Sequence, residues 1–399
     1  MKMKILYITL ENLSLHKGSV VHVKEVVAGL KRRGHQVGLM GRAWTELEGF
    51  EGFYNLHPHR SILAKLLNQR KISFFTSSLL LFIYLFRFLF QYDLVYARDY
   101  HTAIIALLPR LLYHKKLIYE INGLASEEQK LKSHSIFNRV VVFFIKRAEI
   151  LAARNSDQIV SVTPQIGTYL ITHFNCQPNK IKIIGNGVNT KIFHPITDKA
   201  LLGKWRESLD IEMDEVVAVF VGNLARWQGV DILIESGLRL LSIGEKLRFL
   251  IVGDGPLKES LMSRVSRSEF KKEFIFAGMI DYKNIPFLIN ISDFCVAPFI
   301  LRRNQMTGVS PLKIFEYMAC GKPIVTTRVE GLEFIEEQGI GCLVEPEDVE
   351  SLRKGVYVLL QQPHQRIKMG QKGFQIAREN FSWEPRVLEV EKVLKELLA

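Results

Sequence analysis

Lys313 and Glu316 are the two residues of this sequence whose types and spacing most directly suggest chemistry. They stand three positions apart in the stretch GVSPLKIFEYMACGKP, which runs from Gly308 to Pro323. The apolar pattern predicts a helix over residues 312–320, which Gly321 ends, followed by a buried strand, IVTT. Side chains three positions apart lie on about the same face of a helix, so we expect these two to project together.

The start of the same helix has the features of a phosphate site. Gly308, Val309 and Ser310 precede it, where backbone N–H groups could be free. Such groups and the positive end of the helix dipole attract an anion, and the ammonium group of Lys313 adds a point charge. Because a carboxylate repels phosphate, we expect Glu316 to accept hydrogen bonds from sugar hydroxyls instead. The combination predicts a nucleotide-sugar site.

Composition places these residues in a soluble protein of two domains. A chain of 399 residues is too long for one ordinary core, and 48% hydrophobic with 24% charged residues argues against disorder. The four cysteines are far apart and form no CxxC pair, so we expect reduced thiols and no zinc site. The opening residues, MKMKILYITL, match a strand and no signal peptide, which favours a cytoplasmic protein.

The positive charge is concentrated in the N-terminal half. Residues Met1 to Pro195 contain 26 lysines and arginines against 12 acidic residues, whereas the remainder contains 27 against 29. A basic half could face nucleic acid or an anionic membrane, or it could be a solvated surface that only aids solubility.

The elements that position these residues alternate between strand and helix. KILYITL predicts a strand, residues 20–33 a helix that Gly34 ends, and HQVGLMG a second strand. Gly18 and Ser19 lie at the junction of loop and helix, where a backbone can approach a ligand closely. No GxGxxG motif occurs, and no acidic residue ends the second strand, so a dinucleotide cofactor is disfavoured.

The most apolar run of the chain is Phe74 to Phe90, and it contains Arg87. Its 17 residues fall short of the roughly 20 that a spanning helix needs. A transmembrane span, a buried helix and an interfacial helix all remain open. Because a core strand, DLVYARD, follows at once, we interpret the run as a helix packed on the sheet whose outer face touches lipid. Flanking Lys65, Arg70 and Lys71 favour such membrane contact.

The alternation restarts after Pro195. VVAVFVGNL, RFLIVGDGP, EFIFAGMI and DFCVAPF predict strands of a second α/β domain, and the tail from residue 382 predicts one more amphipathic helix. The sequence therefore indicates the α/β class with two successive doubly wound domains.

Taken in order, these pieces resemble a known family. KILYIT with the Gly18-Ser19 pair, GNGVNTKIFHP, FVGNLARWQGVDILIE, VGDGP and GVSPLKIFEYMACGKPIV resemble motifs of the retaining glycosyltransferases of family 4. The resemblance covers essentially the whole chain. It implies the GT-B fold, in which two Rossmann-like domains face a central cleft and a C-terminal helix crosses back to the first domain. We expect an acceptor-side domain over 1–195, a nucleotide-sugar domain over 196–380, and the returning helix over 381–399.

The resemblance assigns roles around the donor motif. Glu316 matches the second glutamate of the family's E-x7-E motif, which binds the donor's ribose, and Lys313 of the SPLK subtype lies by the diphosphate. Gly308 occupies the position of the first glutamate. The sugar hydroxyls are therefore expected to meet backbone N–H groups from Gly308 to Ser310, or another side chain.

Other family positions also differ here. Asn223 and Gln228 stand where the family usually has an arginine and a lysine for the diphosphate, so Arg226 and Lys313 are the expected replacements. Asn122 stands where the family has a sugar-contacting histidine, and its amide can still donate and accept hydrogen bonds. The alternatives are a surface ion pair for Arg226 and a loop-stabilising role for Asn122.

Three further residues follow strands on the side where the resemblance implies the cleft. His22, Arg98 and His101 could meet the acceptor, or each could have a structural role.

Together these features predict a retaining hexosyltransferase that uses a UDP- or GDP-sugar. The expected acceptor is lipid-linked or a cell-surface polysaccharide or glycolipid. We expect no cofactor, no nucleic-acid partner and, without a DxD-type motif, no metal; the protein would lie peripherally on the inner face of the membrane. The alternatives are a GT-B nucleotide-sugar 2-epimerase and an inactive scaffold of a glycan-assembly complex.

Overall fold

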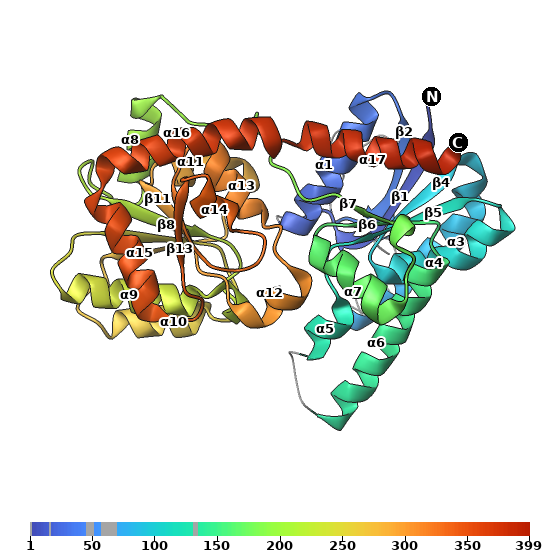
Figure 1. The fold of residues 1–399 in the computed structure, drawn as a ribbon, viewed down its shortest axis with the longest axis horizontal. Helices are drawn as coiled ribbons and strands as arrows, with labels where there is room; N and C mark the ends of the chain where they lie inside the picture. The colour runs from blue at the N-terminus through green and yellow to red at the C-terminus, as the bar shows by residue number, and fades with distance from the viewer. Residues whose placement is uncertain (1, 16, 45–51, 57–69, 131–134) are drawn as a thin grey trace. The chain divides into compact units, whose positions relative to one another are not determined.

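The computed structural model describes residues 2–15, 17–44, 52–56, 70–130 and 135–399. The chain forms two compact units, one of Met1–Asn186 with Trp383–Ala399 and one of Gly187–Ser382. Each unit is a parallel sheet with helices on its faces (Figure 1). The predicted α/β class is thereby confirmed.

The first unit contains a seven-stranded sheet of order β3-β2-β1-β4-β5-β6-β7 in which every neighbouring pair is parallel. Its strands are β1 (Lys4–Asn12), β2 (Gln36–Arg42), β3 (Phe53–Asn55), β4 (Leu94–Arg98), β5 (Lys116–Ile121), β6 (Gln158–Ser161) and β7 (Ile181–Ile183). The central strands are buried along nearly their whole length, as a parallel sheet covered on both faces requires.

Helices of this unit form two layers. They are α1 (Gly18–Arg32), α3 (Arg70–Phe88), α4 (Tyr100–Leu112), α5 (Ala125–Lys130), α6 (Ile136–Asn155), α7 (Pro164–Phe174) and α17 (Trp383–Leu398). In one layer α3 packs on α4, α4 on α6 and α6 on α7, while α1 and α17 pack together in the other. Right-handed crossovers explain this division. The chain adds β2 and β3 on one side of β1 and β4 to β7 on the other, so the connecting helices fall on opposite faces of the sheet.

The apolar run that begins at Phe74 lies in α3 and in the short 3-10 segment Leu89–Gln91 that follows it. Leu81, Leu85 and Leu89 recur at four-residue spacing and are fully buried against the sheet, while Phe75 on the outer face is exposed. This confirms the predicted packing. The segment Phe74–Gln91 is also long and apolar enough to cross a membrane by length and composition alone. Lys65 and the side chains of Arg70 and Lys71 lie outside what the structure describes.

The second unit contains a six-stranded parallel sheet of order β10-β9-β8-β11-β12-β13. Its strands are β8 (Val217–Val221), β9 (Arg248–Val252), β10 (Phe274–Gly278), β11 (Phe294–Ala297), β12 (Ile324–Thr327) and β13 (Gly341–Val344). Its helices are α8 (Lys199–Glu207), α9 (Val230–Ser242), α10 (Lys258–Ser266), α11 (Ile285–Asn290), α12 (Leu301–Thr307), α13 (Leu312–Ala319), α14 (Phe334–Glu337), α15 (Val349–Gln361) and α16 (Pro363–Asn380). Core clusters on both faces of this sheet fix the strands that carry the candidate site.

Helix α16 is an element that the sequence pattern did not reveal. It is polar over most of its length and contains Gly370 and Gly373, which weaken a helix signal. Gly370 instead permits close packing on α13, because a Cβ atom there would lie 2.0 Å from the carbonyl oxygen of Gly321.

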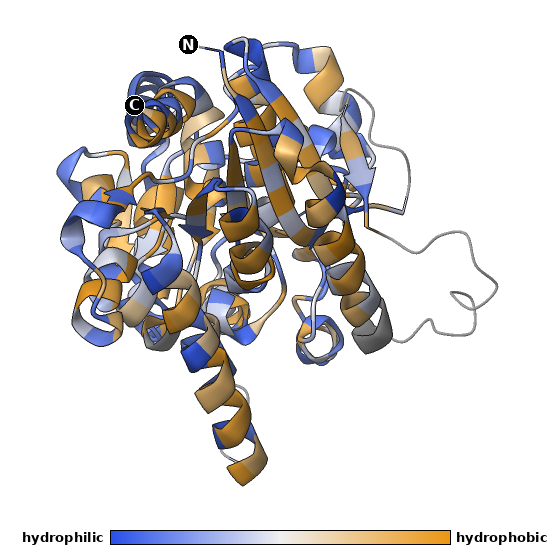
Figure 2. Cartoon of the chain, turned by 90° about the vertical axis from the view of Figure 1, so that its right-hand side faces the viewer, coloured by the Kyte–Doolittle hydropathy of each residue, from blue (hydrophilic) through white to orange (hydrophobic). Residues whose placement is uncertain are grey.

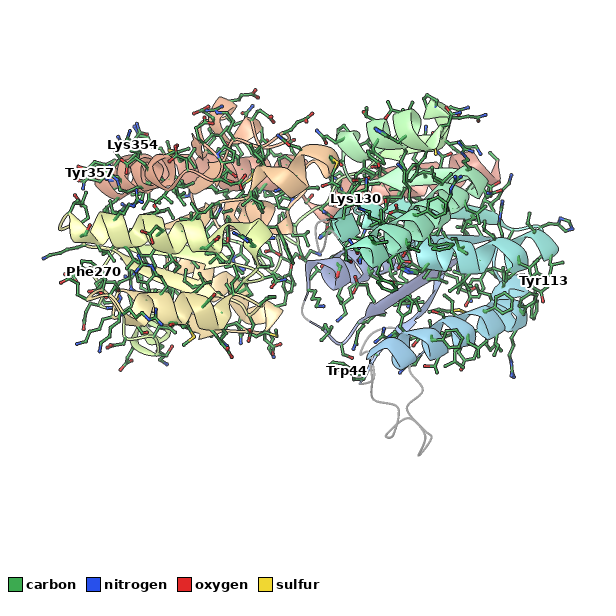
Figure 3. The ribbon with its side chains drawn as sticks, turned by 90° about the horizontal axis from the view of Figure 1, so that it is seen from below. Trp44, Tyr113, Lys130, Phe270, Lys354 and Tyr357 are labelled. Atoms are coloured by element: carbon green, nitrogen blue, oxygen red, sulfur yellow. The ribbon has the colours of Figure 1, made fainter. Side chains whose placement is uncertain are left out.

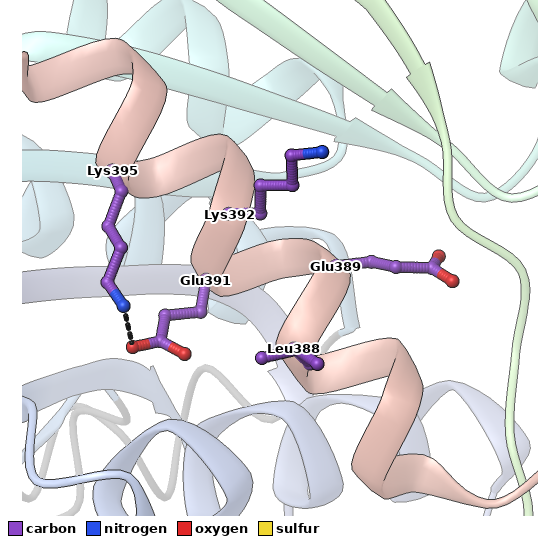
Figure 4. A pocket seen from close by; sticks show the side chains of 5 residues that line it. All are labelled: Leu388, Glu389, Glu391, Lys392 and Lys395. Carbon is purple, nitrogen blue, oxygen red and sulfur yellow. Dashed lines mark ion pairs between the residues drawn. The ribbon is translucent and has the colours of Figure 1, made fainter.

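The predicted C-terminal helix, α17, packs on α1 within the first unit. Its Glu391 is buried and receives hydrogen bonds from Arg33 and from His35, the latter at 3.1 Å. Lys395 lies one turn further along α17, 2.7 Å from the same carboxylate. The two charged residues line a small surface pocket (Figure 4), together with Leu388, Glu389 and Lys392. Burial opposes the charge of Glu391, but its three partners outweigh burial and lower the pKa of the carboxyl to about 2.

Candidate functional site

Helix α13 positions Lys313 and Glu316 at the carboxyl end of β8. Ile314, Tyr317 and Met318 point into the core, which leaves the face with Lys313 and Glu316 turned toward the end of the sheet. The backbone N–H of Val221, the last residue of β8, donates to the Tyr317 hydroxyl at 2.8 Å. That hydrogen bond fixes the helix against the strand and so holds Lys313 and Glu316 in one defined place.

The side chain of Lys313 is half-buried, and its ammonium group contacts both a polar partner and aromatic rings. Its Nζ donates to Oε1 of Gln228 at 2.6 Å and lies 4.2 Å from the ring centroid of Phe220 and 5.4 Å from that of Phe299. Burial lowers the pKa of Lys313 to about 7, and the nearby Glu316 partly opposes that shift. An anion bound here would restore the full positive charge.

Gly222 creates the space for this ammonium group. Its φ of +153° lies in a region that residues with a side chain rarely adopt, and a Cβ atom there would lie 2.5 Å from Nζ of Lys313. The residue after β8 is therefore a glycine for two reasons, its backbone conformation and the lysine above it.

Glu316 is also buried, with 6% of its surface exposed. It accepts a hydrogen bond of 2.9 Å from the hydroxyl group of Tyr282. Burial raises the pKa of Glu316 to about 7, against the opposing influence of Tyr282 and Lys313. A carboxylate has two oxygens and can accept several hydrogen bonds. With Tyr282 as one donor, Glu316 can still accept hydrogen bonds from the hydroxyl groups of a sugar, as expected from the sequence.

The segment before α13 differs in one respect from expectation. Gly308 ends α12 at a φ of +62°, and its N–H donates to the carbonyl oxygen of Asn304 at 2.8 Å. The expectation of a free N–H at Gly308 is therefore corrected, because the C-terminal turn of α12 uses it. Val309 packs against the core, and Ser310 precedes Pro311 at the N-cap of α13.

Arg226 lies in the same short turn as Gln228, a 3-10 segment over Arg226–Gln228. Its side chain is exposed, whereas Gln228 reaches Lys313. Gln228 stands where the family usually has a lysine. Here its side chain instead accepts a hydrogen bond from Lys313.

In the first unit, Glu120 organises the residues predicted from the other motifs. This residue lies next to the carboxyl end of β5 and is 1% exposed, and its carboxylate lies 2.9 Å from His22 Nε2 and 3.7 Å from Arg98 Nε. Asn122 Nδ2 donates to it at 2.7 Å, and the Tyr7 hydroxyl lies 3.4 Å away. Burial opposes its charge, but His22, Arg98 and Asn122 outweigh burial and lower the pKa of Glu120 to about 2.

His22 and Arg98 are buried in this network. Nδ1 of His22 lies 2.7 Å from Oδ1 of Asn186, and the ring packs edge-on against Trp383 of α17. Arg98 donates to the carbonyl oxygen of Ser19, which ties the Gly18-Ser19 start of α1 to β4. The structure therefore gives both side chains positioning contacts, and their contact with an acceptor stays a prediction.

His101 lies apart from this network. Its side chain is 40% exposed at the start of α4, 3.7 Å from Asp99, and its ring lies at a tilt of 32° to that of Tyr100. Among the described residues, no three or more His, Cys, Asp or Glu side chains form a group that could hold a metal ion.

Sequence reasoning missed Glu120 and Tyr282. Glu120 had a signal, since it is the one acidic residue inside the apolar strand LIYEI, and a buried carboxylate needs partners. Tyr282 had none, because it lies 34 positions from Glu316 in a polar turn.

Two family models match the chain. One, described as Glycosyltransferase Family 4, covers residues 16–192, and the other, Glycosyl transferases group 1, covers residues 215–362. The chain is 24% identical to an uncharacterized glycosyltransferase, MJ1607, of Methanocaldococcus jannaschii, over 95% of this chain and 94% of that protein. It is 25% identical to the D-inositol 3-phosphate glycosyltransferase of Corynebacterium efficiens, over 77% of this chain and 72% of that one.

Solved structures share the fold across the whole chain. Sucrose-phosphate synthase from Thermosynechococcus elongatus superposes with a TM-score of 0.79 at 19% identity and covers 99% of both chains. Anabaena Alr3699/HepE in complex with UDP and glucose superposes with a TM-score of 0.74 at 18% identity, over 99% of this chain and 100% of that one. The expected α/β GT-B fold is confirmed.

Proposed function

We propose that this chain is a glycosyltransferase of the family 4 type that transfers a hexose from a UDP- or GDP-sugar with retention of anomeric configuration. The two family models and the fold support glycosyltransferase activity. The observation that carries the donor assignment is the half-buried Lys313 beside the buried Glu316 at the carboxyl end of β8, where ligands bind in open α/β sheets. Alr3699/HepE, which shares the fold, has been solved with UDP-glucose.

The chemistry of transfer assigns Lys313 to the leaving diphosphate. Negative charge grows on the diphosphate as the glycosidic bond breaks, so a cation held nearby stabilises the transition state more than the ground state. Gln228, Phe220 and Phe299 hold the ammonium group before the donor arrives, which reduces the reorganisation needed at the moment of reaction. Loss of one such group typically raises the barrier by about 3–4 kcal/mol.

Glu316 binds the ribose of the donor. Its carboxylate is oriented by Tyr282. Because it lies one helical turn from Lys313, it can bind the ribose while the lysine binds the diphosphate. Arg226 and the N-terminus of α13 at Ser310 add positive potential for the diphosphate, and Asn122, oriented by Glu120, is assigned to the transferred sugar.

The acceptor is a lipid-linked or cell-surface glycan, and the protein lies peripherally on the inner face of the membrane. The excess of basic residues before Pro195 and the exposed apolar face of α3 support this part of the proposal.

The test is incubation of the protein with a panel of nucleotide sugars, with and without membrane extract. Release of free nucleotide that depends on the extract supports transfer. Conversion of the donor without any acceptor would show a 2-epimerase instead, and binding of no nucleotide sugar would show an inactive scaffold.

A further inference from the structure

The first half of α6 exposes large apolar side chains that the fold does not use. Ile136 and Phe137 are 81% and 79% exposed, and Val140, Phe143 and Phe144 are also exposed. The helix extends beyond the body of its unit (Figure 1), and its projecting part is largely hydrophobic (Figure 2). An ordinary surface helix buries its apolar stripe and exposes its polar face. Here the apolar face is the outer one, and none of the residues that the structure describes covers it.

The charged residues of α6 define the chemistry that a partner of this face needs. Arg139, Arg147 and Arg154 are exposed, and Arg147 lies over the ring of Phe143 at 5.2 Å. The single acidic residue of the helix, Glu149, is buried and accepts hydrogen bonds from the backbone N–H groups of Ala125 and Ser126. The outward face therefore combines aromatic and aliphatic side chains with positive charge alone.

We propose that this face of α6 inserts into an anionic lipid bilayer. Phe137, Phe143 and Phe144 enter the boundary between headgroups and acyl chains, and the arginines contact the anionic headgroups. A second copy of the chain fits less well, because a symmetric contact brings the same face of each copy together and this face carries only positive charge. The inference rests on the proposed membrane association, and it identifies α6 as the element that inserts.

Exposure of apolar side chains does not by itself distinguish α6 from the adjacent helices of its layer. Phe75 and Leu79 of α3 and Leu108 of α4 are exposed as well. Their helices remain packed along the sheet, whereas the tip of α6 projects from it (Figure 2). An element that projects can enter a bilayer without displacing the rest of its layer.

Sedimentation of the whole protein with vesicles tests the proposal without any sugar transfer. The vesicles are phosphatidylglycerol mixed with phosphatidylcholine, with pure phosphatidylcholine as the comparison. The double variant Phe137→Ser, Phe144→Ser should lower the partition coefficient at least about tenfold, since each side chain loses its apolar burial. Arg139→Gln and Arg147→Gln should each lower it about fivefold on anionic vesicles only.

The comparison variant is Phe75→Ser, Leu79→Ser, which removes two exposed apolar side chains of α3, the other helix proposed to touch lipid, and it should lose clearly less binding than the α6 variant. Equal loss in both double variants, or loss in the α3 variant alone, overturns the assignment to α6. Absence of binding to anionic vesicles overturns it too, as does a stable dimer that Phe137→Ser, Phe144→Ser makes monomeric. Because all six mutated residues lie exposed on the surface, thermal unfolding of the variants should match the wild type. Failure of the sugar-transfer assay alone leaves this result unaffected.

Discussion

Lys313 and Glu316 are neighbours on α13, where burial lowers the pKa of the lysine and raises the pKa of the glutamate. Each has one fixed polar partner, Gln228 for the lysine and Tyr282 for the glutamate. A site of this kind is poised to change its charge when a ligand arrives, because the ligand supplies the counter-charge that water supplies elsewhere.

Donor binding should therefore be strongest near neutral pH. With the pKa of Lys313 lowered to about 7, the ammonium group is lost as the pH rises above that value, and its attraction for a diphosphate goes with it. With the pKa of Glu316 raised to about 7, the carboxylate takes up a proton as the pH falls below it and accepts fewer hydrogen bonds from ribose. Calorimetric titration with UDP across this range should give a bell-shaped affinity profile. Glu316→Gln should retain only the alkaline limb, and an affinity that rises steadily toward alkaline pH would contradict the pair.

Gly222→Ala tests whether the space beneath Lys313 matters. The added methyl group would displace Nζ from Gln228, and the positive φ costs about 1–3 kcal/mol of stability for a residue with a side chain. We expect UDP affinity to fall about tenfold, the effect of losing a single hydrogen bond to a charged group. Gly203→Ala in α8 is the control, since nothing lies within 4 Å of the added atom. Equal behaviour of the two variants in calorimetry and thermal unfolding would count against this account.

Among the elements, α17 is held to the first unit by a buried carboxylate. Glu391→Gln should lower the free energy of unfolding by about 2 kcal/mol near neutral pH, because the hydrogen bonds from Arg33 and His35 lose their charge assistance. The pKa of Glu391 is lowered to about 2, below its ordinary value of 4.5. Its stabilisation is therefore fully present above pH 4.5 and is lost as the pH falls toward about 2.

Urea titration at several pH values measures this effect. The difference between wild type and Glu391→Gln should shrink steadily in acid. Glu389→Gln is the control on the same helix, where a surface pair with Arg386 contributes about 0.5 kcal/mol at most. A difference that does not change with pH would show that packing, rather than charge, holds α17.

At the scale of the whole molecule, the sequence predicted the elements that depend on residues close together in the chain. Buried parallel strands read as apolar runs, so both sheets could be anticipated, as could the helix that carries Lys313 and Glu316. Helix α16 could not, since its two glycines serve packing on α13 that appears only in three dimensions.

The partners of the site residues were beyond sequence patterns for a similar reason. Gln228 lies 85 positions from Lys313, and Glu120 lies 98 positions from His22, so spacing along the chain carries no trace of either contact. Sequence reasoning identified the chemical groups in the second unit, and only the fold showed what orients them.

The measurement that bears most directly on the donor site compares UDP and GDP binding and sugar transfer in the wild type, Lys313→Met and Lys354→Ala. Methionine keeps the packing on Phe220 while removing the charge, and Glu316 can stay protonated, so the variant should unfold at the wild-type temperature. Lys354 projects from α15 into solvent (Figure 3) and serves as the control. We predict that Lys313→Met loses transfer by about a hundredfold or more and binds nucleotide more weakly, while Lys354→Ala behaves as the wild type does. Wild-type affinity and turnover in Lys313→Met would contradict the assignment of this lysine to the donor diphosphate.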